Sequence, residues 1–226
     1  MIKKARNTQR REESLSRDQI IETAIALLDS GGEAGLTFRA LSEQLATGPG
    51  AIYGHIASKS DLLTAASDAI VARTMEASVD SATPEATIRA VALGMFDAID
   101  AHPWVGSALT RAPGQLPAVR ILERIGQQLR ALGVPDGEQW VTVSALLSYI
   151  LGVGGQNAAN TQLALEREAD RSNFLDEVAT MWSELDPDEY PFTRSVAGQL
   201  RTHDDRVDFL AGIDLILRGI ESARDR

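Results

Sequence analysis

The residues with the clearest chemical pattern lie between positions 36 and 63, in the stretch LTFRALSEQLATGPGAIYGHIASKSDLL. Tyr53 and His55 can donate hydrogen bonds, and Lys59 adds a positive charge six residues after the tyrosine. Phosphate oxygens accept hydrogen bonds from these groups. The pattern is typical of anion recognition, and we see no nucleophile–base pair, paired carboxylates or Gly-rich phosphate loop that would indicate catalysis.

The same stretch predicts two short helices joined by a tight turn. Thr37 is a candidate cap of the first helix, Ala46-Thr47-Gly48 forms the turn, and Pro49 suits the first position of the second helix, where its missing N–H costs nothing. A preceding helix begins at Ser16 and ends at Gly31-Gly32. This arrangement is a helix-turn-helix, in which the second helix can lie in a DNA major groove.

Two interpretations stay open on spacing alone. Tyr53 and His55 are either ordinary surface groups of a small three-helix domain or groups that hold phosphates. Gly48 and Gly50, on the leading turn of the second helix, would let its backbone come close to phosphates and base edges. Lys59 begins a fourth helix, where the helix dipole disfavours a cation unless an anion lies nearby.

Charge divides the chain into two parts. The 226 residues carry a net charge of −10. Residues 1–61 hold eight basic and eight acidic side chains, whereas residues 62–226 hold fourteen arginines and twenty-four acids. We therefore expect a small N-terminal unit that can approach an anion and a larger acidic body that avoids one. Five of the first eleven residues are basic, and a disordered arm that attracts DNA and a solvated tail remain alternatives for them.

Composition narrows the class of protein. The absence of cysteine excludes disulfides, thiolate zinc sites and cysteine nucleophiles. No apolar run approaches the ~20 residues of a membrane span, and no secretory signal is visible, so we expect a cytoplasmic protein with no membrane partner. Nearly every segment has helical periodicity, with no strand pattern or repeat. Residues 166–190 are acid-rich, and we expect a loop there with a short helix around 174–182.

The helix-turn-helix stretch resembles the DNA-binding domain of the tetracycline-repressor (TetR) family. The resemblance rests on Leu36-Thr37, Arg39-Ala40-Leu41, Leu45, Pro49-Gly50-Ala51-Ile52-Tyr53, His55, Lys59 and Leu62-Leu63. It implies a homodimer on double-stranded operator DNA. Phosphates would be held by Thr37, Tyr53, His55 and Lys59, with Arg39, Gly48 and Gly50 at or near the bases. Pro49 is a further candidate DNA-binding residue. The chain departs from the family's usual Gly-Val-Ser turn at residues 46–48 and has Ile56 where an aromatic usually follows the histidine.

The C-terminal body resembles, less specifically, the regulatory domain of the tetracycline-repressor branch. The matching pieces are a His102-Pro103-Trp104 corner, the stretch up to Gly152 of a helix expected over about 136–162, and residues 209–221 of the last helix, expected over about 205–223. This implies a pocket for a small-molecule inducer that the sequence does not identify. Its candidate lining residues are Phe96, His102, Trp104, Tyr149, Gln156 and Asn157, although aromatics at helical spacing usually form core. No second ligand accompanies His102, so we expect no metal site, and no cofactor.

Two helices of the body are apolar over more than one face and contain glycines that permit close approach. We expect them to pair with their symmetry mates in a four-helix bundle, against the alternative of a monomer with a thicker core. The candidate interface residues are Leu147, Leu151, Gly154, Ile213, Ile216 and Ile220.

The sequence thus predicts an all-α protein with a basic arm (1–15), a three-helix helix-turn-helix domain (16–62) and a helical ligand-binding and dimerisation domain (63–226). The function we expect is a ligand-responsive DNA-binding transcriptional regulator, most simply a repressor. The alternatives are a regulator without a small-molecule inducer and a small all-helical enzyme.

Overall fold

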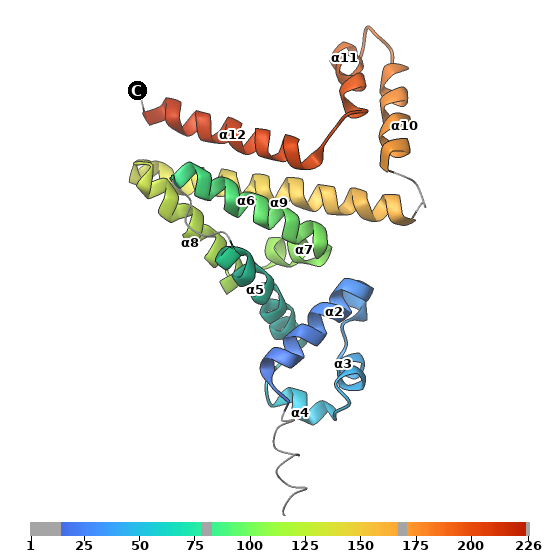
Figure 1. The fold of residues 1–226 in the computed structure, drawn as a ribbon, viewed down its shortest axis with the longest axis vertical. Helices are drawn as coiled ribbons and strands as arrows, with labels where there is room; N and C mark the ends of the chain where they lie inside the picture. Colours follow the sequence, from blue (N-terminus) through green and yellow to red (C-terminus); the bar gives the residue numbers. More distant parts are fainter. Residues whose placement is uncertain (1–14, 78–82, 167–170, 225–226) are drawn as a thin grey trace, which may run out of the picture.

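The computed structural model describes residues 15–77, 83–166 and 171–224, and within these ranges it contains eleven helices and no strand. A small unit of three helices lies at one end of the molecule, a larger helical body lies at the other, and α5 joins them (Figure 1). The predicted basic arm lies outside the described residues except for Leu15. None of the described helices is long and apolar enough to cross a membrane.

Three helices form the small unit: α2 (Arg17–Gly35), α3 (Phe38–Gln44) and α4 (Pro49–Tyr53). The capping box at Ser16 is present in full, because Ser16 accepts from the Gln19 N–H and the Gln19 side chain accepts from the Ser16 N–H. The core of the unit consists of buried aliphatic side chains from all three helices and from the segment after α4: Ile20, Ala24, Leu28, Leu41, Ile52 and Ile56.

The helix that we predicted to end at Gly31-Gly32 bends there and continues. Gly32 has φ +58° and ψ −163°, and a further helical turn runs on to Gly35. Only glycine adopts such a backbone without strain. The bend sets the last turn of α2, which includes Glu33, at a new angle toward the body.

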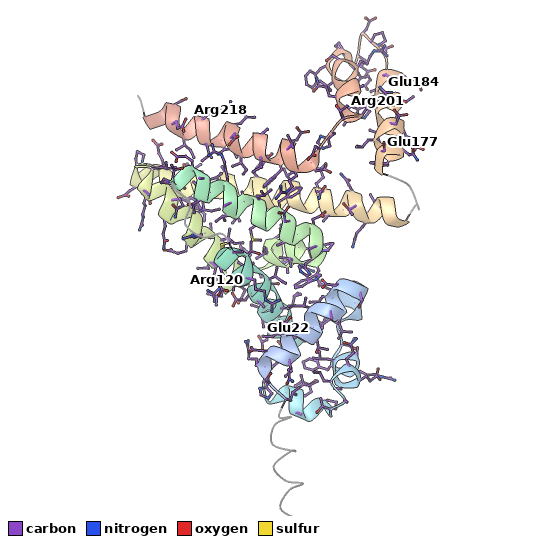
Figure 2. The ribbon with its side chains drawn as sticks, viewed as in Figure 1. Glu22, Arg120, Glu177, Glu184, Arg201 and Arg218 are labelled. Carbon is purple, nitrogen blue, oxygen red and sulfur yellow. The ribbon has the colours of Figure 1, made fainter. Side chains whose placement is uncertain are left out.

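The connecting helix α5 (Lys59–Ala77) is unbroken, and the domain boundary that we predicted after residue 62 falls inside it. Ion pairs hold it on two sides: Arg73 pairs with Glu22 of α2, and Asp68 lies 2.6 Å from Arg120 of α8 (Figure 2). The helix α5 thus has contacts both with the small unit and with the body.

The body consists of α6 (Pro84–Ala101), α7 (Pro103–Arg111), α8 (Leu116–Ala131), α9 (Asp136–Glu166) and α12 (Asp205–Arg224). The helix α12 packs across α6 and α9 through an aromatic stack in which Phe209 lies between Phe96 and Tyr149, at ring-centroid distances of 4.7 and 5.5 Å. The Tyr149 hydroxyl donates to the Phe209 carbonyl at 3.2 Å. Burial and, secondarily, the charge of Asp208 raise the pKa of Tyr149, so that the hydroxyl keeps its proton.

Two helices project from the body as a hairpin, α10 (Arg171–Ser183) and α11 (Pro191–Leu200) (Figure 1). The short helix predicted within 166–190 is longer than expected, and α11 was not predicted. Contacts between the two helices stabilise them: Arg194 donates to the Ser183 and Leu185 carbonyls at the end of α10, and Arg201 pairs with Asp176 at 2.6 Å. Local periodicity does not reveal such support.

The helix-turn-helix turn contains a strained residue. Ala46 has φ +48°, in the left-handed region that costs a residue with a Cβ roughly 1–2 kcal/mol. We predict that Ala46→Gly raises the free energy of unfolding by about 1 kcal/mol, because glycine adopts this conformation freely. Ala51→Gly, on the helical backbone of α4, is the matched control and should lower stability by roughly 0.5–1 kcal/mol. Urea unfolding measures both, and a loss of stability in Ala46→Gly would contradict the assignment of strain.

The close approach of α9 and α12 depends on Gly212. A Cβ at this position would lie 1.9 Å from the Tyr149 hydroxyl oxygen, whereas one at Gly126 on α8 would meet nothing within 4 Å. Gly212→Ala should therefore destabilise the protein by roughly 1–3 kcal/mol, typical of overpacking. Gly126→Ala should be neutral or slightly stabilising. Equal melting temperatures for the two variants would refute the close packing.

Candidate DNA-binding surface and domain junction

The surface of α3 and α4 brings together the residues predicted to contact DNA. Thr37 caps α3, since its hydroxyl accepts from the Ala40 N–H at 3.1 Å. Phe38 stacks on Tyr53 with ring centroids 4.5 Å apart and planes 16° from parallel, which fixes α3 against α4. Tyr53 is nevertheless 54% exposed. A side chain held in place but open to solvent is preorganised to contact a ligand.

The leading turn of α4 is open. Gly48 and Gly50 are exposed, and a Cβ on either would meet no atom within 4 Å. Their lack of side chains is therefore not required by packing within the protein, but it does leave the backbone accessible. Pro49 occupies the first position of α4, as predicted. Beside this turn, α3 and α4 enclose a shallow hollow of about 440 Å³ that includes Arg39 and Tyr53.

Arg39 extends into solvent from α3. Its Nε lies 2.9 Å from Glu43 Oε1, and the hydrogen bond to Glu43, with the carboxylate's charge, raises the pKa of the guanidinium above its ordinary value. The two side chains are 89% and 65% exposed. Exposed ion pairs of this kind contribute little to stability, so Arg39 can leave Glu43 for a base or phosphate at small cost.

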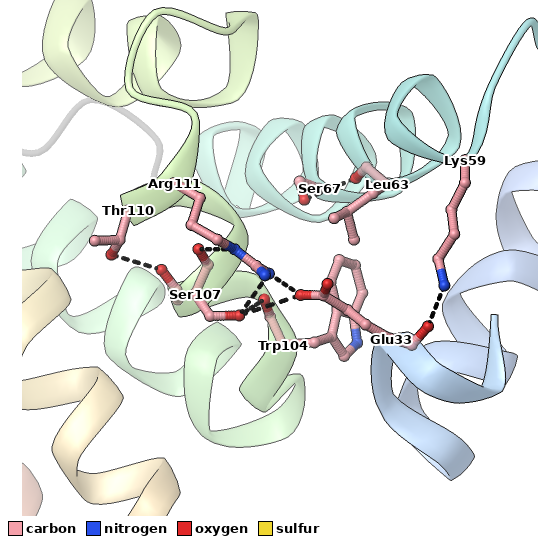
Figure 3. Close-up of polar contacts among 9 residues, drawn as sticks. Glu33, Lys59, Leu63, Ser67, Trp104, Ser107, Thr110 and Arg111 are labelled. Carbon is pink, nitrogen blue, oxygen red and sulfur yellow. Dashed lines mark hydrogen bonds and ion pairs between the residues drawn. The ribbon is translucent and has the colours of Figure 1, made fainter.

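His55 and Lys59 follow α4 and are both exposed. The Lys59 Nζ donates to the main-chain carbonyl of Glu33 at 2.5 Å, on the last turn of α2 (Figure 3). An ammonium group has three N–H donors, so this contact leaves others for a phosphate. Lys59 also lines a pocket with Ala108 and Leu109 of α7, and it is not among the residues of the hollow that includes Arg39 and Tyr53.

That end of α2 meets α7 at a polar junction between the small unit and the body. Asp29 Oδ1 accepts from Trp104 Nε1 at 2.7 Å and lies 2.7 Å from His102 Nδ1. One turn further on, the Glu33 carboxylate pairs with Arg111 (Figure 3). Sequence reasoning missed Asp29, Glu33 and Arg111, because each finds its partner more than 70 positions away; the only local signal was the glycine pair that bends α2.

The six candidate ligand-binding residues fall into separate places. His102 and Trp104 lie at the junction. Tyr149, Gln156 and Asn157 line a pocket of about 300 Å³ between α9 and the start of α12, where Asn157 also donates to Asp100 at 2.7 Å. Phe96 is buried in the core. Among the described residues no three His, Asp or Glu side chains come together as a metal site.

The six candidate interface residues also divide. Ile213, Ile220 and Gly154 are buried inside the protomer, and a Cβ at Gly154 would lie 3.2 Å from Ile99 Cδ1. These three positions therefore pack within their own protomer, and their part in a dimer interface stays a prediction. Leu147, Leu151 and Ile216 are half-buried against the core. The exposed stripes of the two helices comprise other residues: Val141, Ala145, Ser148 and Gly152 on α9, and Ala211, Leu215, Gly219 and Ser222 on α12.

Comparison with known proteins agrees with this architecture. Residues 20–66 match the family described as "Bacterial regulatory proteins, tetR family", and residues 82–224 match the "Tetracyclin repressor-like, C-terminal domain". The solved structure of the transcriptional regulator SCO7222, a TetR from Streptomyces coelicolor, is 53% identical, with a TM-score of 0.84 over 92% of this chain and 98% of that one.

Two more distant relatives share parts of this pattern. The structure of ActR from S. coelicolor in complex with actinorhodin is 20% identical, with a TM-score of 0.75 over 92% of this chain and 96% of that one, which shows the fold alone. The HTH-type transcriptional repressor DrrR1 of Streptomyces coeruleorubidus is 27% identical over 75% of this chain and 61% of its own length. The chain thus spans about 60% of the length of the curated relatives it matches. Because the two family matches together cover most of the chain, and the second alone covers more than half, the chain belongs to the TetR family of DNA-binding transcriptional regulators and is not an enzyme.

Proposed function

We propose that the protein is a homodimeric repressor that binds a palindromic operator through α3 and α4 and leaves it when a small molecule binds the body. The observation that carries this proposal is the combination of an open, preorganised surface at one end with a rigid connection to the body. The helix α4, which carries Gly50 and Tyr53 and is capped by Gly48, lies at the end of the molecule remote from α12 (Figure 1). The unbroken α5 joins the body to that surface, so that a movement of the body would reach it.

Pockets in the body and at its junction support a ligand. Besides the pocket at Tyr149, a pocket of about 450 Å³ lies between α5 and α7, within the range usual for small-molecule sites. The ActR structures in complex with actinorhodin and (S)-DNPA support the same idea for a distant relative. A ligand shifts the protein away from DNA only if it binds the other arrangement more tightly. A regulator without an inducer would bind the same DNA but would not be released.

The exposed stripes of α9 and α12 support a two-fold dimer. Leu215 is 64% exposed on α12 and Val141 is 63% exposed on α9, while small residues beside them permit close helix contact. Two recognition helices related by two-fold symmetry would read a palindrome with half-sites roughly 34 Å apart. We propose that the protein is located in the cytoplasm, because its operator DNA would lie in that compartment.

Selection of bound genomic fragments tests the proposal most directly. The protein should enrich a palindromic sequence, and candidate inducers can then be chosen from the genes beside it and tested for release of that fragment in a gel shift. Affinity should fall steeply with salt, because phosphate contacts release counterions. Recovery of no preferred sequence would contradict the proposed function.

The phosphate contacts make a specific prediction. His55→Ala and Lys59→Gln should each weaken binding about tenfold, the effect of losing one charge-assisted hydrogen bond. Lys59→Gln should also lower the slope of log affinity against log salt by about 1. Arg130→Gln removes a cation from the far end of α8 and should change neither quantity. Affinity like that of the unmodified protein in the first two variants, measured by gel shift, would exclude the assignment.

The proposed dimer face leads to a further prediction. Leu215→Glu places a charge on the exposed stripe of α12, so each protomer should fold normally. The Kd of the dimer should rise about tenfold or more, because the charge would be desolvated in the interface. Leu116→Glu, equally apolar and 52% exposed on α8, is the control. Sedimentation should show monomers for the first variant alone. An unchanged dimer in Leu215→Glu would exclude this face.

A further inference from the structure

One ion pair lies between two cavities at the domain junction. Glu33 and Arg111 line both the pocket between α5 and α7 and a larger cleft of about 810 Å³ between α2, α7 and α9. Figure 3 shows the Arg111 guanidinium against the Glu33 carboxylate, with Lys59 donating to the Glu33 carbonyl from the other side. Glu33 is therefore contacted by a cation from each of the two helices that form the smaller pocket.

The smaller pocket has a charge unlike that of the chain as a whole. Its described lining contains two cations, Lys59 and Arg111, and a single acid, Glu33, whereas the whole chain has a net charge of −10. The remaining walls are uncharged: Ser60, Leu63, Thr64, Ser67, Ala108, Leu109, Ala112, Gln115 and Pro117. A pocket with apolar and hydroxyl-bearing walls and two cations selects an apolar molecule with one anionic group.

We propose that the α5–α7 pocket binds such an apolar anion, and that the anion takes Arg111 away from Glu33. The proposal rests on the ligand-responsive function proposed above and names the class of ligand and the contact it breaks. The chemistry is an exchange of carboxylate partners. A guanidinium pairs as well with a ligand carboxylate, sulfonate or phenolate as with Glu33, and the ligand adds burial of its apolar part.

The existing ion pair is weak enough to be displaced. The Arg111 side chain is 57% exposed and that of Glu33 is 31% exposed, so water screens their attraction. Ser107 supports the pair: its carbonyl accepts from Arg111 Nε at 3.2 Å. This contact holds the guanidinium at the end of α7 whether its partner is Glu33 or a ligand.

Loss of the pair would act on the DNA-binding unit through the last turn of α2. This turn follows the bend at Gly32 and is held to α7 by Arg111 and to α5 by Lys59. An anion attracted to both cations releases the turn from both helices. The ligand and the paired arrangement then exclude each other, so by linkage the ligand weakens DNA binding and DNA weakens ligand binding equally.

A pair of fluorescent probes tests the pocket without knowledge of the natural ligand. The probes are 8-anilinonaphthalene-1-sulfonate, an apolar anion, and N-phenyl-1-naphthylamine, which has the same aromatic framework without the charge. Arg111→Gln should weaken binding of the sulfonate about tenfold and leave the uncharged probe within about twofold. Glu33→Gln should strengthen binding of the sulfonate several-fold, about threefold or more, by removing its competitor.

Matched variants locate the site. Glu22→Gln breaks the Glu22–Arg73 pair, which also joins α2 to α5 and is similarly exposed but lines neither cavity, and it should leave both probes unaffected. Thr64→Phe fills the smaller pocket and should exclude both probes, whereas Ala159→Phe fills the cleft and should exclude neither. Melting curves of each variant confirm that it is folded. Sulfonate binding that survives Arg111→Gln and Thr64→Phe would overturn the proposal.

The coupling to DNA is tested separately, with a fragment recovered by the genomic selection. The sulfonate should release this fragment from the unmodified protein, and Glu33→Gln should bind it about tenfold more weakly, whereas Glu22→Gln should bind it normally. If the protein binds DNA and Glu33→Gln binds it equally well, the proposed switch is wrong while the repressor function stands. If no DNA is selected, the repressor function fails, and the probe measurements still decide the pocket.

Discussion

The attachment of α2 to α7 is the contact on which the relation between the two domains depends. Trp104 is only 6% exposed and Asp29 is 33% exposed, so the hydrogen bond from the indole to Asp29 is partly shielded from water. His102 Nδ1 lies 2.7 Å from the same carboxylate oxygen. With α5 forming the other attachment, the small unit is held at two points. We infer that a shift of α7 relative to α5 would act on α2, the helix against which α3 packs.

Local signals were sufficient to predict the helix-turn-helix but not this junction. Serine and threonine caps and Pro49 act within one turn of the residues they fix, and the structure has each of them where the sequence placed it. Asp29 and Glu33, by contrast, read as ordinary surface acids of an amphipathic helix. Their role depends on α7, which follows about 70 residues later and whose orientation no local pattern determines. The helix α11 was missed for a similar reason, since Arg194 and Arg201 stabilise it through α10.

Apolar stripes are equally ambiguous between core and interface. Ile213 and Leu215 lie two positions apart on α12, yet the first is fully buried and the second is 64% exposed. The sequence shows that α12 has more apolar surface than one face requires. Which of its apolar stripes is buried depends on how α12 packs on the body within one protomer. Gly212 and Gly154 show the same dependence, because the close contacts that they permit are with Tyr149 and Ile99 of the same chain. Pattern alone therefore predicts that a second apolar face exists but not which residues form it.

The charge distribution makes DNA affinity sensitive to the way the small unit is attached to the body at two points. The acidic body repels DNA, and at physiological salt that repulsion decays over about 8 Å. We expect α5 to hold most of these acids away from the DNA, so that the open turn of α4 can reach a groove despite the net charge of −10. In the dimer that we propose, a tilt of the body relative to α3 and α4 would change both the spacing of the recognition helices and the distance of the acids from the phosphates. Misplaced contacts and increased repulsion then act in the same direction, so a modest movement at α7 can have a large effect on DNA affinity.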